Sequence, residues 1–350
     1  MTTEIALLLS VDGIANGAIY VLVGLGIVLV FSVTRVIFVP FGDIVAFAAL
    51  TQAALQLNRV PGTIYLLAAL AAVAALMEAV HWGRRGDVRR LVRGVLGYGV
   101  LPLAPAALGL LVAGRDLPVG AEIALTLALV VPLGPLLDRI AFRPIADASV
   151  LVLLMVAVAL HFAVAGLGLL FFGPEGFRTR PLTDALLEVG GLVVTAQVAL
   201  MVAASIAFSG LLFLYFGHTL QGRALRATAV NRTGARLVGI RPAATGTLAF
   251  LVASLLGGVS GLLIGPVATI YYDSGFLIGL KAFVGAIIGG LASYPVTALG
   301  AVMVGLLESF ASFYASALKE TVVFAALIPI LLWRSLSLGH ADEEQEEVDA

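Results

Sequence analysis

Long uninterrupted runs of apolar residues dominate this sequence and leave it few ways to fold. A helix needs roughly 20 apolar residues to cross the hydrocarbon core of a bilayer, and about 17 to 25 are tolerated. The runs lack the alternation that builds a membrane β-barrel, so helices must satisfy the backbone. The expected fold class is therefore an all-α integral membrane protein, a polytopic bundle of about 9–11 transmembrane helices. The candidate segments are residues 13–33, 43–58, 63–81, 94–113, 121–137, 149–172, 194–216, 243–265, 277–293, 296–316 and 320–334.

Composition excludes a water-soluble protein and several kinds of chemistry. Of the 350 residues, 61% are hydrophobic and only 12% are charged, whereas a soluble domain carries about 25% charged residues. The chain has no cysteine, and its four histidines are widely scattered. We therefore expect no disulfide, no metal site, no redox chemistry and no nucleic-acid partner.

Basic residues predict how the chain is oriented. Alternating the segments across the bilayer places 14 of the 20 Lys and Arg residues on one face and five on the other, with Lys281 inside a segment. The positive-inside rule makes the richer face cytosolic. We predict a multi-pass protein of the bacterial inner membrane, with its N-terminus outside and its C-terminus in the cytoplasm.

The domain organisation is simple. Residues 1–334 are expected to form a single transmembrane domain, and the acidic residues 335–350 a disordered cytosolic tail. Glycines interrupt the apolar runs between residues 243 and 316, so broken or re-entrant helices are expected in the C-terminal half. The charge alternation allows either two or four crossings there.

Motifs that would mark an enzyme are missing from the sequence. There is no G-x-x-x-x-G-K-[ST] loop to cradle nucleotide phosphates, no H-E-x-x-H pair and no G-x-S-x-G elbow. We expect no catalytic residue. Any uphill transport by this chain must draw its energy from another protein or from a gradient.

The most informative stretch is the predicted cytosolic segment 218–242. Asn231 can cap a short helix that begins at Arg232, Gly239 suits the left-handed position after that helix, and Pro242 can start the next membrane helix. Small residues in the segment, such as Gly234, would allow another surface to approach closely. An ordinary positive-inside loop explains the arginines equally well.

A family resemblance rests on five stretches in order. They are Asn16-Gly17-Ala18-Ile19-Tyr20 with Gly42-Asp43, then Asp138-Arg139-Ile140-Ala141-Phe142-Arg143-Pro144, then Arg226-Ala227-Thr228-Ala229-Val230-Asn231 through Ile240, then Lys281-Ala282-Phe283, and Gly289-Gly290-Leu291-Ala292-Ser293 with Pro295. In this order they resemble bacterial permeases of the branched-chain amino acid ABC uptake family. Two departures stand out: Phe41 replaces a histidine common before Gly42-Asp43, and residues 59–120, with a basic stretch from Arg84 to Arg93, are longer than usual.

The resemblance implies a permease subunit of a binding-protein-dependent importer. Its substrates would be branched-chain or other small amino acids, or related amides such as urea. The implied partners are a second permease subunit, two cytosolic ATPase subunits, an extracytoplasmic substrate-binding protein and the lipid bilayer. The chain itself would hold no cofactor, since the ATPases bind ATP. A gradient-driven secondary transporter or channel is the alternative.

Two sets of candidate site residues follow from the resemblance. The ATPase-coupling candidates are Arg223, Arg226, Ala229, Asn231, Gly234, Ala235, Arg236 and Gly239. The candidates for the translocation path are Asn16, Tyr20, Asp43, Lys281 and Phe283. A lysine buried in a membrane helix is a functional candidate, with snorkelling to the interface as the alternative. For Asp43, capping of its own helix is the favoured role.

Overall fold

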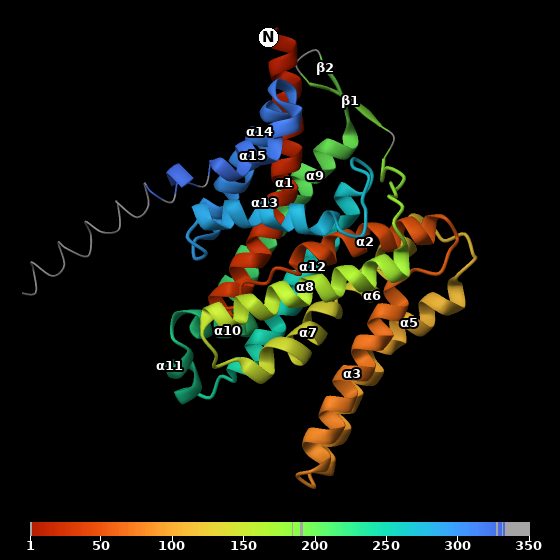
Figure 1. The fold of residues 1–350 in the computed structure, drawn as a ribbon, viewed down its shortest axis with the longest axis vertical. Coiled ribbons are helices and arrows are strands. Elements are labelled where there is room, and N and C mark those ends of the chain that lie inside the picture. Colours follow the sequence, from red (N-terminus) through yellow and green to blue (C-terminus); the bar gives the residue numbers. More distant parts are fainter. Residues whose placement is uncertain (1, 184, 190–191, 327, 331, 333–350) are drawn as a thin grey trace, which may run out of the picture.

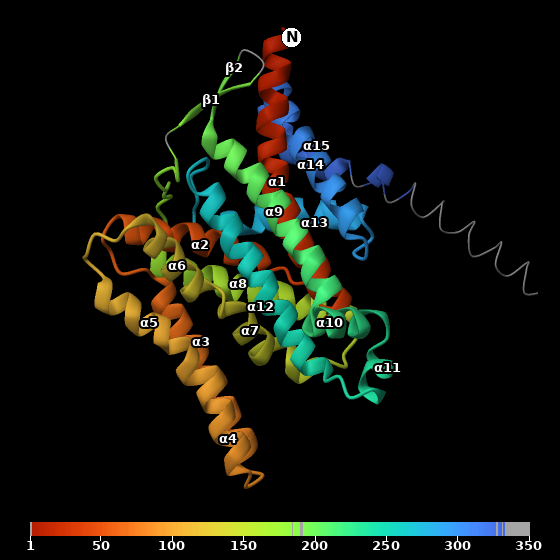
Figure 2. The ribbon, with the colours of Figure 1, turned by 180° about the vertical axis from the view of Figure 1, so that it is seen from behind.

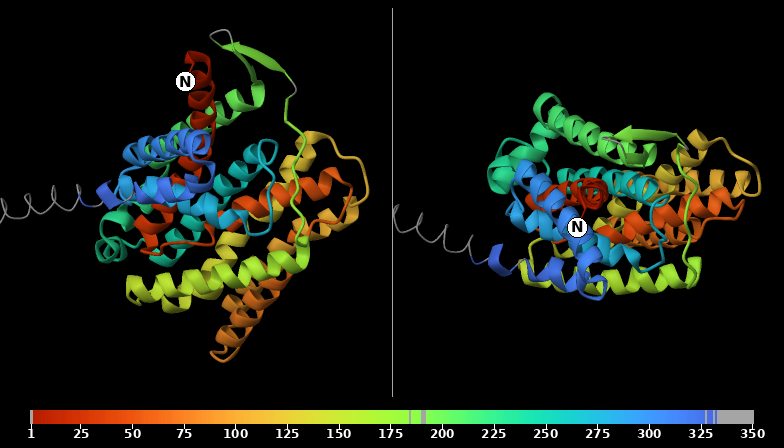
Figure 3. Two further views of the ribbon diagram at one scale, coloured as in Figure 1. Left: turned by 45° about the horizontal axis from the view of Figure 1, so that its top comes forward. Right: turned by 90° about the horizontal axis from the view of Figure 1, so that it is seen from above.

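One long helix forms the axis of the bundle in this computed structural model, which describes residues 2–332 apart from 184, 190–191, 327 and 331. This helix, α1 (Thr3–Thr34), is buried along nearly all of its length from Gly13 to Val30. It packs against α14, α12, α13 and α9, whose bounds follow. Viewed along α1, helices α8 and α9 lie on opposite sides of it (Figure 3).

The N-terminal half supplies five of the predicted membrane segments beyond α1. The segment 121–137 is divided at Pro132, whose ring cannot continue a regular helix. Helices α3 to α5 project from one end of the bundle (Figures 1 and 2). The elements are α2 (Phe41–Gln56), α3 (Thr63–Gly83), α4 (Val88–Gly94), the π-helical η1 (Val95–Val100), α5 (Leu101–Val112), α6 (Val119–Val130), α7 (Leu133–Leu137), the π-helical η2 (Asp138–Phe142), the 3-10 turn η3 (Arg143–Ile145) and α8 (Val150–Phe172).

The C-terminal half contains four further predicted membrane segments as α9, α12, α13 and α14, and a small hairpin. The last predicted segment, 320–334, corresponds in the described residues to the seven-residue α15, and its end lies outside them. The hairpin pairs Leu186 with Thr195 in antiparallel register between α8 and α9. The all-α prediction missed these two strands, because no membrane-length run falls there. The elements are β1 (Leu186–Val189), β2 (Leu192–Thr195), α9 (Ala196–His218), α10 (Leu220–Val230), α11 (Arg232–Leu237), α12 (Pro242–Ile264), α13 (Ser274–Ile288), α14 (Tyr294–Tyr314), the 3-10 turn η4 (Ser316–Leu318) and α15 (Lys319–Ala325).

Eight helical stretches in the described part of the chain are long and apolar enough to cross a bilayer, and α2 and α13 are shorter. Two of the eight, Val88–Val112 and Val119–Ile145, each combine several of the elements named above. At 1.5 Å per residue the 16 residues of α2 and the 15 of α13 extend about 24 and 22 Å, less than a hydrocarbon core of about 30 Å. The polytopic bundle is confirmed. Re-entrant helices stay a prediction, and the short α2 lies outside the half of the chain where they were expected.

Glycine does not break α12, contrary to one expectation. The helix runs unbroken through Gly257, Gly258 and Gly261. A side chain at Gly261 would overlap the backbone of Val45, because α12 packs directly on α2. These glycines therefore permit close helix packing and do not interrupt the backbone.

Glycines also allow close packing of α1 on α14. A Cβ placed on Gly13 or Gly17 would lie 2.8 Å from the Cα of Leu306 or Val302, and one on Gly305 would overlap α1. The G-x-x-x-G spacing of Gly13 and Gly17 is thus a packing contact, as small residues commonly are between membrane helices.

Two further predictions concern residues outside those that the structure describes. They are the acidic tail at residues 335–350 and the cytosolic position of Arg334. The orientation of the chain in the membrane stays a prediction too.

Cysteine labelling can decide the orientation, because the chain has no cysteine of its own. Glu175 precedes the single long helix α9 and Thr233 follows it, and both side chains are exposed. In intact cells with a permeabilised outer membrane, we expect a membrane-impermeant maleimide to label Glu175→Cys and to spare Thr233→Cys. Both variants should react after lysis. Labelling of Thr233→Cys alone in intact cells would reverse the predicted orientation, and equal labelling would contradict a membrane-spanning α9.

Candidate functional site

The segment between α9 and α12 has the local geometry that its sequence predicts. The side chain of Asn231 accepts a hydrogen bond of 2.8 Å from the backbone N–H of Gly234 and so caps α11. Gly239 has a φ of +87°, a left-handed value that disfavours other residues. Pro242 is the first residue of α12. These three predictions are confirmed, and together they define two short helices with fixed ends.

The segment is attached firmly to the bundle. Helix α10 packs on α9, α12 and α1. The hydroxyl of Thr245 in α12 donates to that of Thr228 in α10 at 3.2 Å. Ala235 is buried, and the guanidinium of Arg232 donates to the carbonyl of Ala146 at 3.3 Å. A force on α10 or α11 would therefore be passed to the membrane helices.

The other side of the two helices is bare and apolar. We use the name outer face for the exposed side chains of α10 and α11 together with that of Val238, which follows α11. Its four large apolar side chains are 75–87% exposed, although none lies in a candidate membrane span. Arginines surround them. The apolar members are Leu220, Val230, Leu237 and Val238, and the exposed arginines are Arg223, Arg226 and Arg236.

The small residues predicted to let a partner approach closely differ in how far they are exposed. Ala229 is half-buried, and Ala235 is fully covered by this chain itself. A Cβ on Gly234 would lie 3.2 Å from the side chain of Asn231. Close approach by a partner is therefore limited at Ala235, and Gly234 serves its own helix cap. The sequence did not single out Leu237, which is 85% exposed at the end of α11.

Inside the bundle, Lys281 is the centre of a charged cluster. Its ammonium lies 2.5 Å from the carboxylate of Glu308 and 3.0 Å from that of Glu320. The hydroxyl of Tyr20 donates to the second oxygen of Glu308 at 2.5 Å. With Lys281 only 5% exposed, the cluster ties together α1, α13, α14 and α15. Snorkelling to the interface is wrong, because two carboxylates hold the ammonium inside.

Asp43 makes a second buried pair. Its carboxylate lies 2.7 Å from Nδ1 of His161, and both residues are buried. The expected helix-capping role is wrong, since the cap position of α2 is Pro40 and no side chain bonds there. The His161 ring stacks on Phe276 with centroids 4.7 Å apart. His161 was not among the predicted site residues, and its one signal in the sequence is that it is a lone histidine in an otherwise apolar helix.

The remaining candidates for the translocation path, Phe283 and Asn16, do not connect the Lys281 cluster with the Asp43–His161 pair. Phe283 borders an apolar cavity of about 230 Å³ between α8 and α13, which Phe162 and Phe276 also line. Phe276 thus connects the cavity to the Asp43–His161 pair. Asn16 only reaches Asp12 on its own helix, at 3.5 Å.

The chain is similar in sequence to known membrane permeases. A profile of the family described as "Branched-chain amino acid transport system / permease component" matches residues 94–332. LivH of Salmonella typhimurium, a high-affinity branched-chain amino acid transport system permease protein, is 28% identical over 204 residues, 56% of this chain and 66% of LivH. The match thus spans slightly less than two thirds of LivH. BraD of Pseudomonas aeruginosa, a permease protein of the same description, is 25% identical over 96% of both chains. No solved structure matches significantly.

The Lys281 cluster makes a prediction about stability. Replacing Lys281 by Met leaves Glu308 and Glu320 without their cation, and breaking a buried ion pair costs about 3–5 kcal/mol. We expect Lys281→Met to lower the free energy of unfolding by at least about 3 kcal/mol in detergent denaturation. Adding Glu308→Gln should restore part of the loss, because Glu320 is the more exposed carboxylate and can reach water.

Lys319→Met provides the matched control, since this half-buried lysine has no salt bridge among the described residues. It should unfold like the wild type. A Lys281→Met protein as stable as the control would show that the cluster contributes nothing to folding.

Proposed function

The chain belongs to the branched-chain amino acid transport permease family, and from this premise we propose that it is the membrane subunit of an ABC importer. As its substrates we propose branched-chain or other small amino acids, with related amides such as urea as further candidates. The family profile and the names of the relatives support this class.

The proposed assembly contains several chains. A second permease subunit completes the translocation path, two cytosolic ATPase subunits bind ATP, and an extracytoplasmic protein delivers the substrate. The sequence supports this division of labour, since it carries no phosphate-binding loop. In this assembly the energy of ATP hydrolysis reaches the membrane helices through a contact with the ATPase subunits.

The outer face of α10 and α11 carries the proposal. Apolar side chains such as Leu237 and Val230, 85% and 87% exposed, are costly in water and mark surfaces that a partner covers. The surrounding arginines suit a partner with acidic groups. Because α11 is capped and leads through Gly239 into α12, a movement of the bound ATPase would be transmitted as a push on that helix.

An aliphatic substrate suits the interior. The cavity bordered by Phe283 is almost wholly apolar, and its volume of about 230 Å³ accommodates a branched aliphatic side chain. The Asp43–His161 pair behind Phe276 offers a polar partner for the charged end of an amino acid.

We expect Leu237→Asp to separate the permease from its ATPases. Burying the introduced aspartate carboxylate in an apolar contact would weaken docking by several kcal/mol. In the free permease the same side chain stays in water, because position 237 is exposed. The variant should insert at the wild-type level, lose co-purification with the proposed ATPase subunits, and lose ATP-dependent uptake. Leu237 is preferred to Gly234 for this test, because a side chain at Gly234 presses on the Asn231 cap.

Leu186→Asp is the control, since Leu186 is 66% exposed in β1 and also lies outside the candidate membrane spans. It should keep both ATPase binding and uptake. If Leu237→Asp binds the ATPases like the wild type, the outer face is not the docking site. Uptake that continues without any ATPase would instead support a gradient-driven carrier.

A further inference from the structure

A wide cleft opens at the end of α3, away from the Lys281 cluster and from the outer face. Its volume is about 890 Å³, and it lies between the last two turns of α3 and the turns η2 and η3. None of the functions proposed above uses it. Its lining includes Glu78, Trp82, Arg84, Arg85, Arg139 and Arg143.

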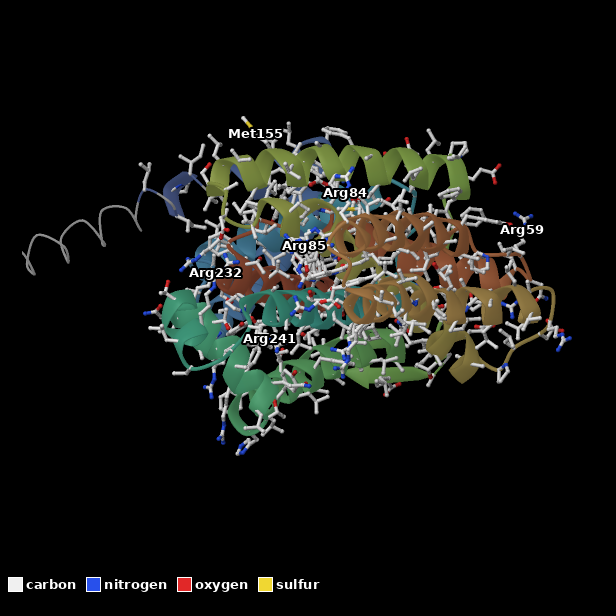
Figure 4. The ribbon with its side chains drawn as sticks, turned by 90° about the horizontal axis from the view of Figure 1, so that it is seen from below. Arg59, Arg84, Arg85, Met155, Arg232 and Arg241 are labelled. Atoms are coloured by element: carbon white, nitrogen blue, oxygen red, sulfur yellow. The ribbon has the colours of Figure 1, made fainter. Side chains whose placement is uncertain are left out.

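The cleft carries an excess of positive charge. Arg139 is neutralised by Glu78, at 2.5 Å. Within the part of the chain that the structure describes, no carboxylate lies within salt-bridge distance of Arg84, Arg85 or Arg143. Figure 4 shows Arg84 and Arg85 on the face seen from below. Three arginines without a salt bridge therefore line one cleft, where Arg143 also donates a hydrogen bond of 2.8 Å to the hydroxyl of Tyr98. Guanidinium groups suit an anion with several oxygens.

One wall of the cleft is apolar and belongs to a membrane helix. Helix α3 is a candidate span, and Leu76 and Val80 near its end are 65% and 45% exposed and line the cleft. Trp82 lies two residues after Val80 in α3, and the Arg85 guanidinium lies 5.5 Å from the centre of the Trp82 ring. A tryptophan and arginines at the end of a span mark the level of the lipid headgroups.

We propose that this cleft binds the headgroup of an anionic phospholipid, with Arg84, Arg85 and Arg143 on the phosphate. The acyl chains would run along Leu76 and Val80 towards the middle of the bilayer. Basic pockets between membrane helices are suited to such lipids. A soluble anion would use the arginines but would gain nothing from the exposed apolar wall, which is why a lipid fits the whole cleft.

The binding would have a structural consequence. Arg143 also lines a second cleft, of about 590 Å³, together with Arg232 and Arg236 of α11. A lipid on Arg143 would therefore bridge the end of α3 to the turn that borders α11. The basic stretch that makes residues 59–120 unusual would serve to hold this lipid.

Lipid retention by the purified chain tests the proposal. Native mass spectrometry would compare the protein with phosphatidylglycerol and with phosphatidylcholine, at equal concentration in detergent. We expect the wild type to prefer phosphatidylglycerol, and the double variant Arg84→Gln, Arg85→Gln to bind it about thirtyfold less, since each arginine contributes about 1 kcal/mol to the binding of an anionic lipid. Both side chains are exposed, so folding should not change.

Two further variants make the result specific. Arg59→Gln with Arg115→Gln removes the same charge from exposed loops elsewhere and should bind like the wild type. Arg84→Lys with Arg85→Lys keeps the charge and should retain most of the binding. Equal binding of the two lipids, or equal loss in the Arg59 and Arg115 control, would overturn the proposal. Competition by inorganic phosphate at millimolar concentration would also overturn it and indicate a soluble anion.

Discussion

Backbone contact between helices at glycine is the constraint on which the rest of this structure depends. Lipid tails are as apolar as leucine, so membrane helices gain stability chiefly from close packing and from polar contacts. Gly13 and Gly17 allow α1 to touch α14, and Gly42 and Gly275 bring the first turns of α2 and α13 into backbone contact. Around these contacts the long α1 is enclosed on nearly all sides.

The close packing decides where polar side chains can be placed. Because α13 and α14 both lie against α1, Lys281, Glu308 and Tyr20 meet in one cluster. The contact of α2 with α13 likewise sets Asp43 near Phe276, on which its partner His161 stacks. The buried charges have polar partners, as a low-dielectric interior requires. Lys281 is paired with carboxylates, whereas the buried carboxylates of Glu122 and Asp138 accept hydrogen bonds from the neutral side chains of Gln56 and Thr247. The outer face of α10 and α11 is the contrasting case, with apolar groups left bare.

Features set by neighbours in sequence could be predicted, and features set by distant residues could not. Apolar runs located the membrane helices, and Asn231, Gly239 and Pro242 gave the ends of α11 and α12 correctly. The sequence offered no partner for Asp43, since His161 lies 118 residues away. Glu320 was missed for the same reason. The glycines of α12 were misjudged as breaks because their effect depends on α2, which a single sequence does not place.

The central claim, that this chain is the membrane subunit of an ATP-driven importer, can be measured directly. The wild-type chain would be reconstituted in proteoliposomes with the proposed ATPase subunits, a second permease subunit and the binding protein, without any ion gradient. We predict accumulation of radiolabelled leucine or a related small amino acid that needs ATP and stops when the ATPases are omitted. Accumulation driven by an imposed ion gradient, and indifferent to ATP, would contradict the account.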